Sequence, residues 1–138
     1  MIIDTKQLLN QLSKAKDIHK FIEEYEQEFL NLSPFDFMNE MLAKKGVSPA
    51  EIAKKSGQGE YVYKVFRGER HPSRDVVLAI AVGMGLGIEE TQLLLRISKL
   101  ASLDPRDKRD SIILYSIKEK HKIEQLNDLL YELNEQTL

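Results

Sequence analysis

Basic side chains crowd the middle of this 138-residue chain, and the chemistry that suits them best is the neutralisation of phosphate. Residues 44–74 carry eight lysines and arginines against three acidic residues, which gives this segment a charge of +5. Residues 1–43 and 75–138 carry −4 and −3, so the net charge of −2 averages a basic segment with two acidic ones. A local basic surface attracts nucleic acid even when the whole chain is slightly acidic.

Residue types that support catalysis are scarce and widely spaced. The three histidines, His19, His71 and His121, lie about 50 residues apart, and none belongs to a local pattern with metal-ligand spacing. The chain has no cysteine, which excludes a disulfide scaffold, a thiolate zinc site and a cysteine nucleophile. The glycine-rich run 83–87 lacks the Gly-Lys-Ser/Thr of a phosphate-binding loop, so we interpret it as a helix stop and bend. We therefore expect a protein that is not an enzyme and holds no metal or cofactor.

Helical periodicity extends over almost the whole sequence, and no stretch alternates as the strands of a β-hairpin do. Apolar residues recur at steps of three and four, as in Leu126, Leu129, Leu130 and Leu133. The fold class is therefore all-α. The expected helices span about 4–12, 14–30, 34–45, 49–56, 59–67, 74–84, 89–99, 105–120 and 124–134.

Four of these helices begin at recognisable caps. Ser33-Pro34, Ser48-Pro49 and Asp104-Pro105 each place a capping oxygen before a proline, and a carboxylate follows two residues later. Ser73, which follows Pro72, is a further cap. The sequence thus predicts helix starts at residues 34, 49, 74 and 105.

The chain shows no sign of secretion or of a membrane anchor. Its first residues lack a basic stretch followed by a long apolar run, and no segment approaches 18 consecutive apolar residues. We expect a cytoplasmic protein.

A weak internal repeat occurs in the second half. The segment SRDVVLAIAV at 73–82 aligns with KRDSIILYSI at 108–117, an offset of 35 residues that makes Arg74/Arg109 and Asp75/Asp110 identical pairs. One explanation is coincidence among helix caps and core positions. The other is a helical hairpin followed by a similar hairpin that extends the same core. Both explanations remain open on the sequence alone.

The basic segment has the layout of a helix-turn-helix. A short helix that contains Ile52-Ala53 breaks at Ser56-Gly57, and a second one that contains Tyr61-Val62 ends at Gly68. Together with Val47 to Glu51, the run from Gly68 to Ser73 and the apolar Leu78-Ala79-Ile80-Ala81, this ordered set resembles the lambda-repressor-like, xenobiotic-response-element (XRE) family of bacterial and phage regulators.

The resemblance covers about residues 34–97 and implies a division of the chain. Residues 1–33 are then an N-terminal helical extension, 34–99 an XRE-like helix-turn-helix domain, and 100–138 a C-terminal helical hairpin that packs on the same core. The flanking helices 1–33 and 105–134 are expected to complete the core and to mediate self-association or control by a regulatory protein partner.

The resemblance also implies a function: a sequence-specific transcriptional regulator that binds double-stranded DNA as a homodimer. Helix 49–56 would brace against the backbone and helix 59–67 would enter the major groove. Helical periodicity predicts an inward side of this second helix at Val62, Val65 and Phe66, with Tyr61 near the boundary. The residues expected toward its outward side are Glu60, Tyr63, Lys64 and Arg67. The implied DNA-binding residues are Lys45, Ser48, Lys54, Lys55, Gln58, Glu60, Tyr61, Tyr63, Lys64, Arg67, Arg70 and Arg74.

Two departures from the family pattern keep a second hypothesis open. Gly57 and Gly68 are one residue closer than in the family, and a residue lost inside the second helix would rotate it by about 100°. A residue lost from the turn would be harmless. Glu60 places a carboxylate near the groove, where it repels phosphate. The alternative is a protein-protein interaction adaptor built on a helix-turn-helix scaffold that has lost DNA readout.

Overall fold

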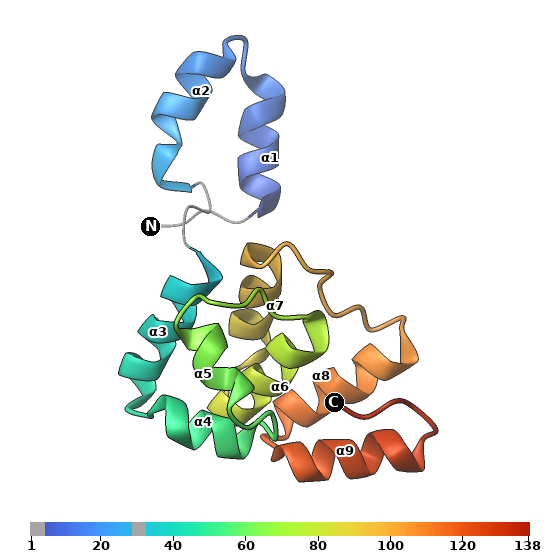
Figure 1. Cartoon of the computed structure of the whole chain (residues 1–138). Helices are drawn as coiled ribbons and strands as arrows, with labels where there is room; N and C mark the ends of the chain where they lie inside the picture. Colours follow the sequence, from blue (N-terminus) through green and yellow to red (C-terminus); the bar gives the residue numbers. More distant parts are fainter. Residues whose placement is uncertain (1–4, 29–32) are drawn as a thin grey trace. The chain divides into compact units, whose positions relative to one another are not determined.

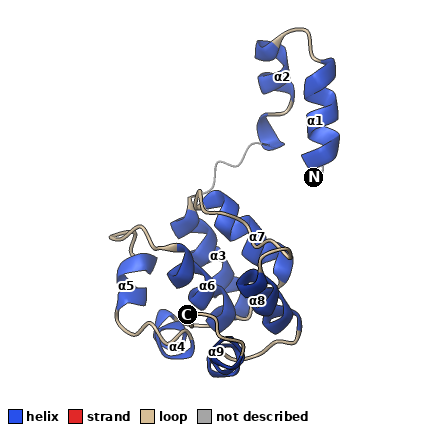
Figure 2. Ribbon diagram, turned by 90° about the vertical axis from the view of Figure 1, so that its right-hand side faces the viewer, coloured by secondary structure: helices blue, strands red, loops and turns tan. Residues whose placement is uncertain are grey.

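The computed structural model describes residues 5–28 and 33–138, and within these ranges the regular elements are helices alone (Figures 1 and 2). The predicted all-α class with about nine helices is therefore confirmed. None of the described helices combines the length and hydropathy that a membrane-spanning segment needs. The described residues fall into two compact units, 5–28 and 33–138, and each is described by itself.

The first unit is a helical hairpin of α1 (Thr5–Lys14) and α2 (Ile18–Glu24), followed by a 3-10 turn at Glu26–Glu28. The expected long helix at 14–30 starts four residues late because Asp17 caps it, accepting a hydrogen bond from the His19 N–H at 2.9 Å. Phe21 is the buried side chain of this hairpin, and the centroid of its ring lies 4.8 Å from the centroid of the Tyr25 ring. Residues 4, 29 and 30 of the expected helices lie outside the described residues.

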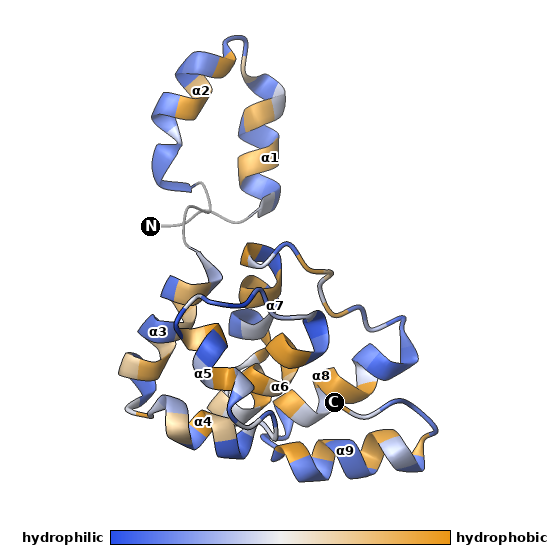
Figure 3. Ribbon diagram, in the orientation of Figure 1, coloured by the Kyte–Doolittle hydropathy of each residue, from blue (hydrophilic) through white to orange (hydrophobic). Residues whose placement is uncertain are grey.

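The second unit contains seven helices around one apolar core. Helix α6 contacts α4, α7 and α9. Seven of its residues are buried, and all seven are apolar, so most of the helix has the colour of hydrophobic residues in Figure 3. Helices α8 and α9 contribute to the same core as α3 to α7. The seven helices are α3 (Pro34–Lys45), α4 (Pro49–Lys55), α5 (Tyr61–Phe66), α6 (Arg74–Met84), α7 (Ile88–Ile97), α8 (Lys108–Lys118) and α9 (Ile123–Glu132).

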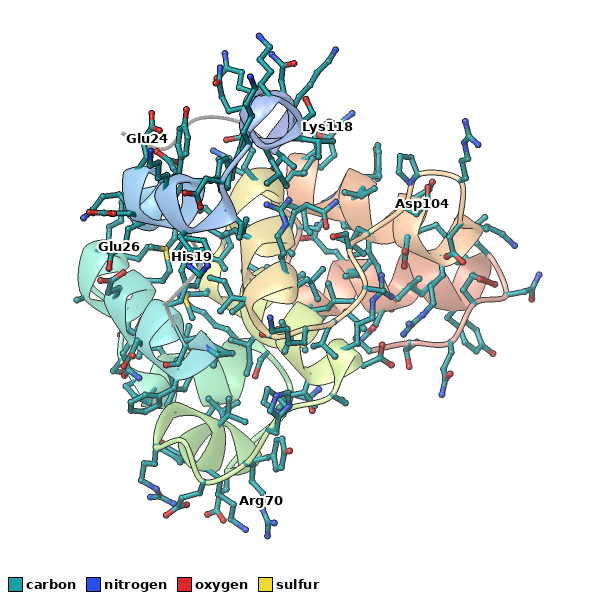
Figure 4. All side chains as sticks on the ribbon, turned by 90° about the horizontal axis from the view of Figure 1, so that it is seen from above. His19, Glu24, Glu26, Arg70, Asp104 and Lys118 are labelled. Atoms are coloured by element: carbon teal, nitrogen blue, oxygen red, sulfur yellow. The ribbon has the colours of Figure 1, made fainter. Side chains whose placement is uncertain are left out.

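Three of the four predicted helix starts are confirmed by their caps. The hydroxyls of Ser33, Ser48 and Ser73 accept backbone N–H groups of the first turns of α3, α4 and α6 at 3.0 to 3.3 Å. The start predicted at 105 is wrong, because Asp107 caps α8 instead. Asp104 lies in the connection ahead of this helix (Figure 4), where its carboxylate accepts the Arg106 N–H at 2.9 Å in a tight turn.

The repeat at an offset of 35 residues is a repeat of structure. In the hairpin α6–α7, the Gln92 amide donates to the Leu103 carbonyl at 2.9 Å and accepts from the Leu103 N–H at 2.7 Å. In α8–α9, the Asn127 amide makes the same two bonds with Leu138, at 3.3 and 2.8 Å. Gln92 and Asn127 are 35 positions apart, and so are Leu103 and Leu138. The segment that follows each hairpin is therefore held by the same pair of hydrogen bonds. This favours the duplicated hairpin over coincidence.

Candidate nucleic-acid interface

Helices α4 and α5 and the turn at 56–60 form a compact helix-turn-helix (Figure 1). Helix α4 is held inward by Ile52, which is fully buried, and by Ala53. The turn needs two glycines with positive φ, +74° at Gly57 and +61° at Gly59, a region that other residues rarely adopt. The Gly59 N–H donates to the Ala53 carbonyl at 3.1 Å and closes the turn against the end of α4.

Helix α6 fixes the position of α4 through a close backbone approach. A Cβ atom added at Gly83, near the end of α6, would lie 2.9 Å from the Ser56 nitrogen and 3.1 Å from the Lys55 carbonyl carbon. Glycine is required there because these neighbours are backbone atoms that cannot rotate away. The run 83–87 is therefore a helix end, as expected, with Gly85 as the left-handed cap of α6.

Helix α5 presents the two faces that the sequence predicts. Val62, Val65 and Phe66 are at most 5% exposed, whereas Lys64 and Arg67 are exposed. The close spacing of Gly57 and Gly68 therefore does not rotate α5 away from its expected orientation. The far end of α5 is tied to α3, because the Asn39 amide donates to the Phe66 carbonyl at 3.2 Å. The contact from Asn39 had no signal in the sequence.

The two tyrosines of α5 lie closer to the core than expected. Tyr61, which is expected near the boundary between the inward and outward sides of α5, is half-buried. Tyr63, which is expected on the outward side, is also half-buried and packed against the core. Helix α5 has only six residues and lies against both α3 and α4, so its outward face is narrow. Tyr63 is therefore at the edge of this face.

Besides Arg74, which is described below, three of the predicted cations have an acidic neighbour. The Arg67 guanidinium lies 3.0 Å from the Glu69 carboxylate, and both side chains are more than half exposed. Two lysines are more loosely paired: Lys45 with Glu90 at 3.8 Å and Lys55 with Glu51 at 3.9 Å. The exposed pairs of Arg67 and Lys55 contribute at most about 1 kcal/mol, so these two cations remain available to another anion. The Lys45 pair is more sheltered, because the Lys45 and Glu90 side chains are only 30% and 31% exposed.

Three further predicted cations, Lys54, Lys64 and Arg70, are exposed and have no ion pair within the described residues. Arg70 projects from the connection after α5 (Figure 4). Together with Lys45, Lys55 and Arg67 they form what we call the basic face: Lys45, Lys54, Lys55, Lys64, Arg67 and Arg70.

The remaining predicted polar contacts surround the helix starts. The Ser48 hydroxyl is engaged as the cap of α4, where it accepts from Glu51 N at 3.3 Å. Glu60 is exposed at the start of α5 and makes no capping bond. Gln58 is half-buried in the turn, and its backbone N–H donates to the Ser56 hydroxyl at 3.3 Å.

Arg74 is a correction to the predicted set. Its guanidinium donates to both carboxylate oxygens of Asp110, at 3.1 and 2.9 Å, and to the carbonyls of Ala101 and Ser102. Four of its five N–H donors are thus engaged inside the fold, which leaves little for a phosphate. The hydrogen bond to Asp110 raises the pKa of Arg74 above its ordinary value. Its position among basic residues concealed this structural role.

Sequence reasoning also missed two lysines outside the basic segment. Lys120 and Lys122 lie in the turn between α8 and α9, and they line a groove together with Lys54 and Lys55 of the basic face. The repeat offered a signal for them, because the positions 35 residues earlier are Gly85 and Gly87. Among the described residues, no group of three or more His, Cys, Asp and Glu is placed to hold a metal ion.

No protein-family model, curated protein or solved structure matches this chain.

Proposed function

We propose that this chain is a duplex-DNA-binding transcriptional regulator of the XRE helix-turn-helix type. The observation that carries the proposal is the geometry of α5. Its buried face, with Val62 and Val65, anchors it on the core, and Lys64 and Arg67 extend from the opposite face next to a tight turn. A short helix presented in this way fits the major groove of DNA.

Phosphate neutralisation supplies most of the affinity in this proposal. Lysines and arginines of the basic face would displace counterions from the DNA backbone, so affinity should fall steeply with salt. Arg67 is the residue best suited to read a base, because a guanidinium can bind guanine O6 and N7 together. Its exposed pair with Glu69 is weak enough to exchange for such a contact.

A regulator of this kind acts as a two-fold dimer in the proposal, with one α5 in each half-site. Two recognition helices on a palindromic site lie about one helical turn of DNA apart, roughly 34 Å. The N-terminal hairpin carries exposed apolar side chains, among them Leu9, Ile18 and Ile22. These are candidates for self-association or for contact with a regulatory protein partner.

A second candidate function is a protein-interaction adaptor that has lost DNA readout. Two observations favour it: Glu60 is exposed beside α5, and Arg67 already has a carboxylate partner in Glu69. Both features place negative charge near the surface that would approach phosphate. In this alternative, the outward face of α5 contacts a protein.

The two candidates are separated by titrating the full chain against mixed-sequence duplex DNA at several salt concentrations. A regulator binds at about 50 mM salt and loses affinity steeply as salt rises. The double variant Lys64→Ala with Arg67→Ala should weaken binding at an unchanged thermal midpoint. The variant Arg96→Ala with Arg106→Ala removes the same charge from exposed positions elsewhere and should bind nearly as well. If no DNA binding is detected at about 50 mM salt, the regulator proposal fails and the adaptor function is favoured.

A further inference from the structure

A groove of about 580 Å³ opens where the end of α4 meets the turns of both duplicated hairpins. One turn, at 85–87, joins α6 to α7, and the other, at 119–122, joins α8 to α9. Figure 1 shows the end of α4 beside the start of α9, and the two helices are neighbours in Figure 2 as well. The volume falls in the range of about 300–1,000 Å³ that small-molecule sites occupy.

The floor of the groove is apolar. It is formed by side chains from the ends of α6 and α8, the turn at 85–87 and the start of α9, each at most 9% exposed. An apolar group resting on such a floor leaves water without displacing a polar partner. The residues of the floor are Val82, Met84, Leu86, Ile117 and Ile123.

The rim of the groove is cationic. Lys54, Lys55, Lys120 and Lys122 line it against a single carboxylate, Glu124, an excess of three positive charges. Three of these lysines make no ion pair within the described residues, and the contact of Lys55 with Glu51 is a loose one between exposed side chains at 3.9 Å. Four ammonium groups around one opening attract an anion.

This charge distinguishes the second hairpin of the repeat from the first. Gly85 and Gly87 of the first hairpin correspond to Lys120 and Lys122 of the second. Lys120 has φ of +58°, close to the +72° of Gly85, in the region that favours glycine. The two lysines therefore add two positive charges to the groove at positions where the first hairpin has uncharged glycines.

We propose that the groove binds a small amphipathic anion, with one phosphate or carboxylate head against the lysines and an apolar tail on the floor. This binding goes beyond the proposed DNA recognition and does not depend on it.

The test uses the full-length, ¹⁵N-labelled chain and octyl phosphate as the probe. Inorganic phosphate supplies the head alone, octanol the tail alone, and octanoate the other head. We expect octyl phosphate to bind at least tenfold more tightly than phosphate or octanol. The amide shifts should concentrate at residues 83–87 and 120–124. Equal binding of octanol, shifts centred elsewhere, or no shift at millimolar probe would overturn the proposal.

Substitutions in the groove test whether octyl phosphate binds there. Lys120→Gln with Lys122→Gln should weaken octyl phosphate at least fivefold at an unchanged thermal midpoint. Gly87→Phe should block the groove, because Gly87 has ordinary backbone angles and open space around it, with the nearest atom 4.0 Å from an added Cβ. Arg96→Gln with Arg106→Gln removes equal charge outside the groove and should bind like the parent. Parent-like binding by the lysine variant would contradict the site.

Discussion

Arg74 and Asp110, at the starts of α6 and α8, are joined by two parallel hydrogen bonds of 3.1 and 2.9 Å. Arg109 and Asp75, which occupy the equivalent positions with the roles exchanged, are joined by two bonds of 2.9 and 3.1 Å. Each hairpin of the repeat therefore supplies the arginine for the other's aspartate. A bidentate pair fixes direction as well as distance, so these two crossed pairs set how the hairpins meet.

The two crossed pairs should differ in their contribution to stability because their burial differs. The Asp110 side chain is 8% exposed, whereas that of Asp75 is 43% exposed. Arg74→Ala leaves a buried carboxylate without its partner and should lower the free energy of unfolding by about 2–4 kcal/mol. Arg109→Ala leaves a solvated one and should cost about 1 kcal/mol. Urea denaturation of both variants measures this, and equal losses would contradict it.

The same pair predicts the acid side of the stability profile. Burial opposes ionisation of Asp110, but hydrogen bonds from Arg74 and from the Asp104 N–H outweigh it and hold its pKa below the ordinary value. The stabilisation is therefore present above about pH 4, the unfolded pKa, and is lost as pH falls through the lower folded value.

Asp110→Asn tests this directly. The variant should be less stable than the parent at pH 7, and its free energy of unfolding should fall less steeply below about pH 4. The difference in slope is at most about 1.4 kcal/mol per pH unit, the value for one proton. Urea midpoints at pH 7, 5, 4 and 3 give both slopes. Identical acid slopes would show that Asp110 does not carry the effect.

Interactions between residues close in the sequence made much of the fold predictable, whereas contacts between residues far apart in the sequence could not be predicted. The caps at Ser33, Ser48 and Ser73 involve residues three positions apart, so the sequence contains both partners. Arg74 and Asp110 are 36 positions apart, and nothing local distinguishes a structural arginine from a phosphate ligand.

The candidate site follows the same division. Helical periodicity predicted the buried and exposed faces of α5 correctly at Val65, Phe66 and Lys64. It misplaced Tyr63, because a six-residue helix packed on two neighbours buries more than one face. The groove could not be predicted from the sequence, because α4 and two turns from the second half of the chain form it together.

Gly83→Ala should destabilise the contact between α6 and α4. Alanine is the better helix former by about 1 kcal/mol, but its Cβ would lie 2.9 Å from the Ser56 nitrogen. Overpacking against backbone costs about 1–3 kcal/mol, so we expect a net loss of about 1–2 kcal/mol. Gly87→Ala, where the nearest atom is 4.0 Å away, is the control and should change stability by less than about 0.5 kcal/mol. Thermal or urea unfolding compares them; a stabilised Gly83→Ala would refute the close approach.

If both the DNA-binding proposal and the groove proposal hold, the two ligands should compete. Lys54 and Lys55 belong to the basic face and also line the groove, so an anion bound there neutralises charge that DNA would use. Saturating octyl phosphate should weaken DNA binding and reduce the salt slope by about 1–2. Fluorescence polarisation with labelled duplex measures both, with octanol as the neutral control. Unchanged DNA affinity at saturation would mean that these lysines do not serve both ligands.

A single substitution at Lys120 should separate the effect on stability from the effect on ligand binding. Its left-handed backbone is strained for lysine, and glycine relieves that strain while adding freedom to the unfolded chain. Lys120→Gly should therefore stabilise the fold by about 0.5–1 kcal/mol and yet weaken octyl phosphate binding. Lys99→Gly is the matched control, because Lys99 has φ of +60° in the loop after α7 and does not line the groove. It should stabilise by a similar amount and leave binding unchanged. Urea unfolding and the octyl phosphate titration on both variants give the four values, and a Lys120→Gly variant that binds as tightly as Lys99→Gly would leave no functional reason for the strained lysine.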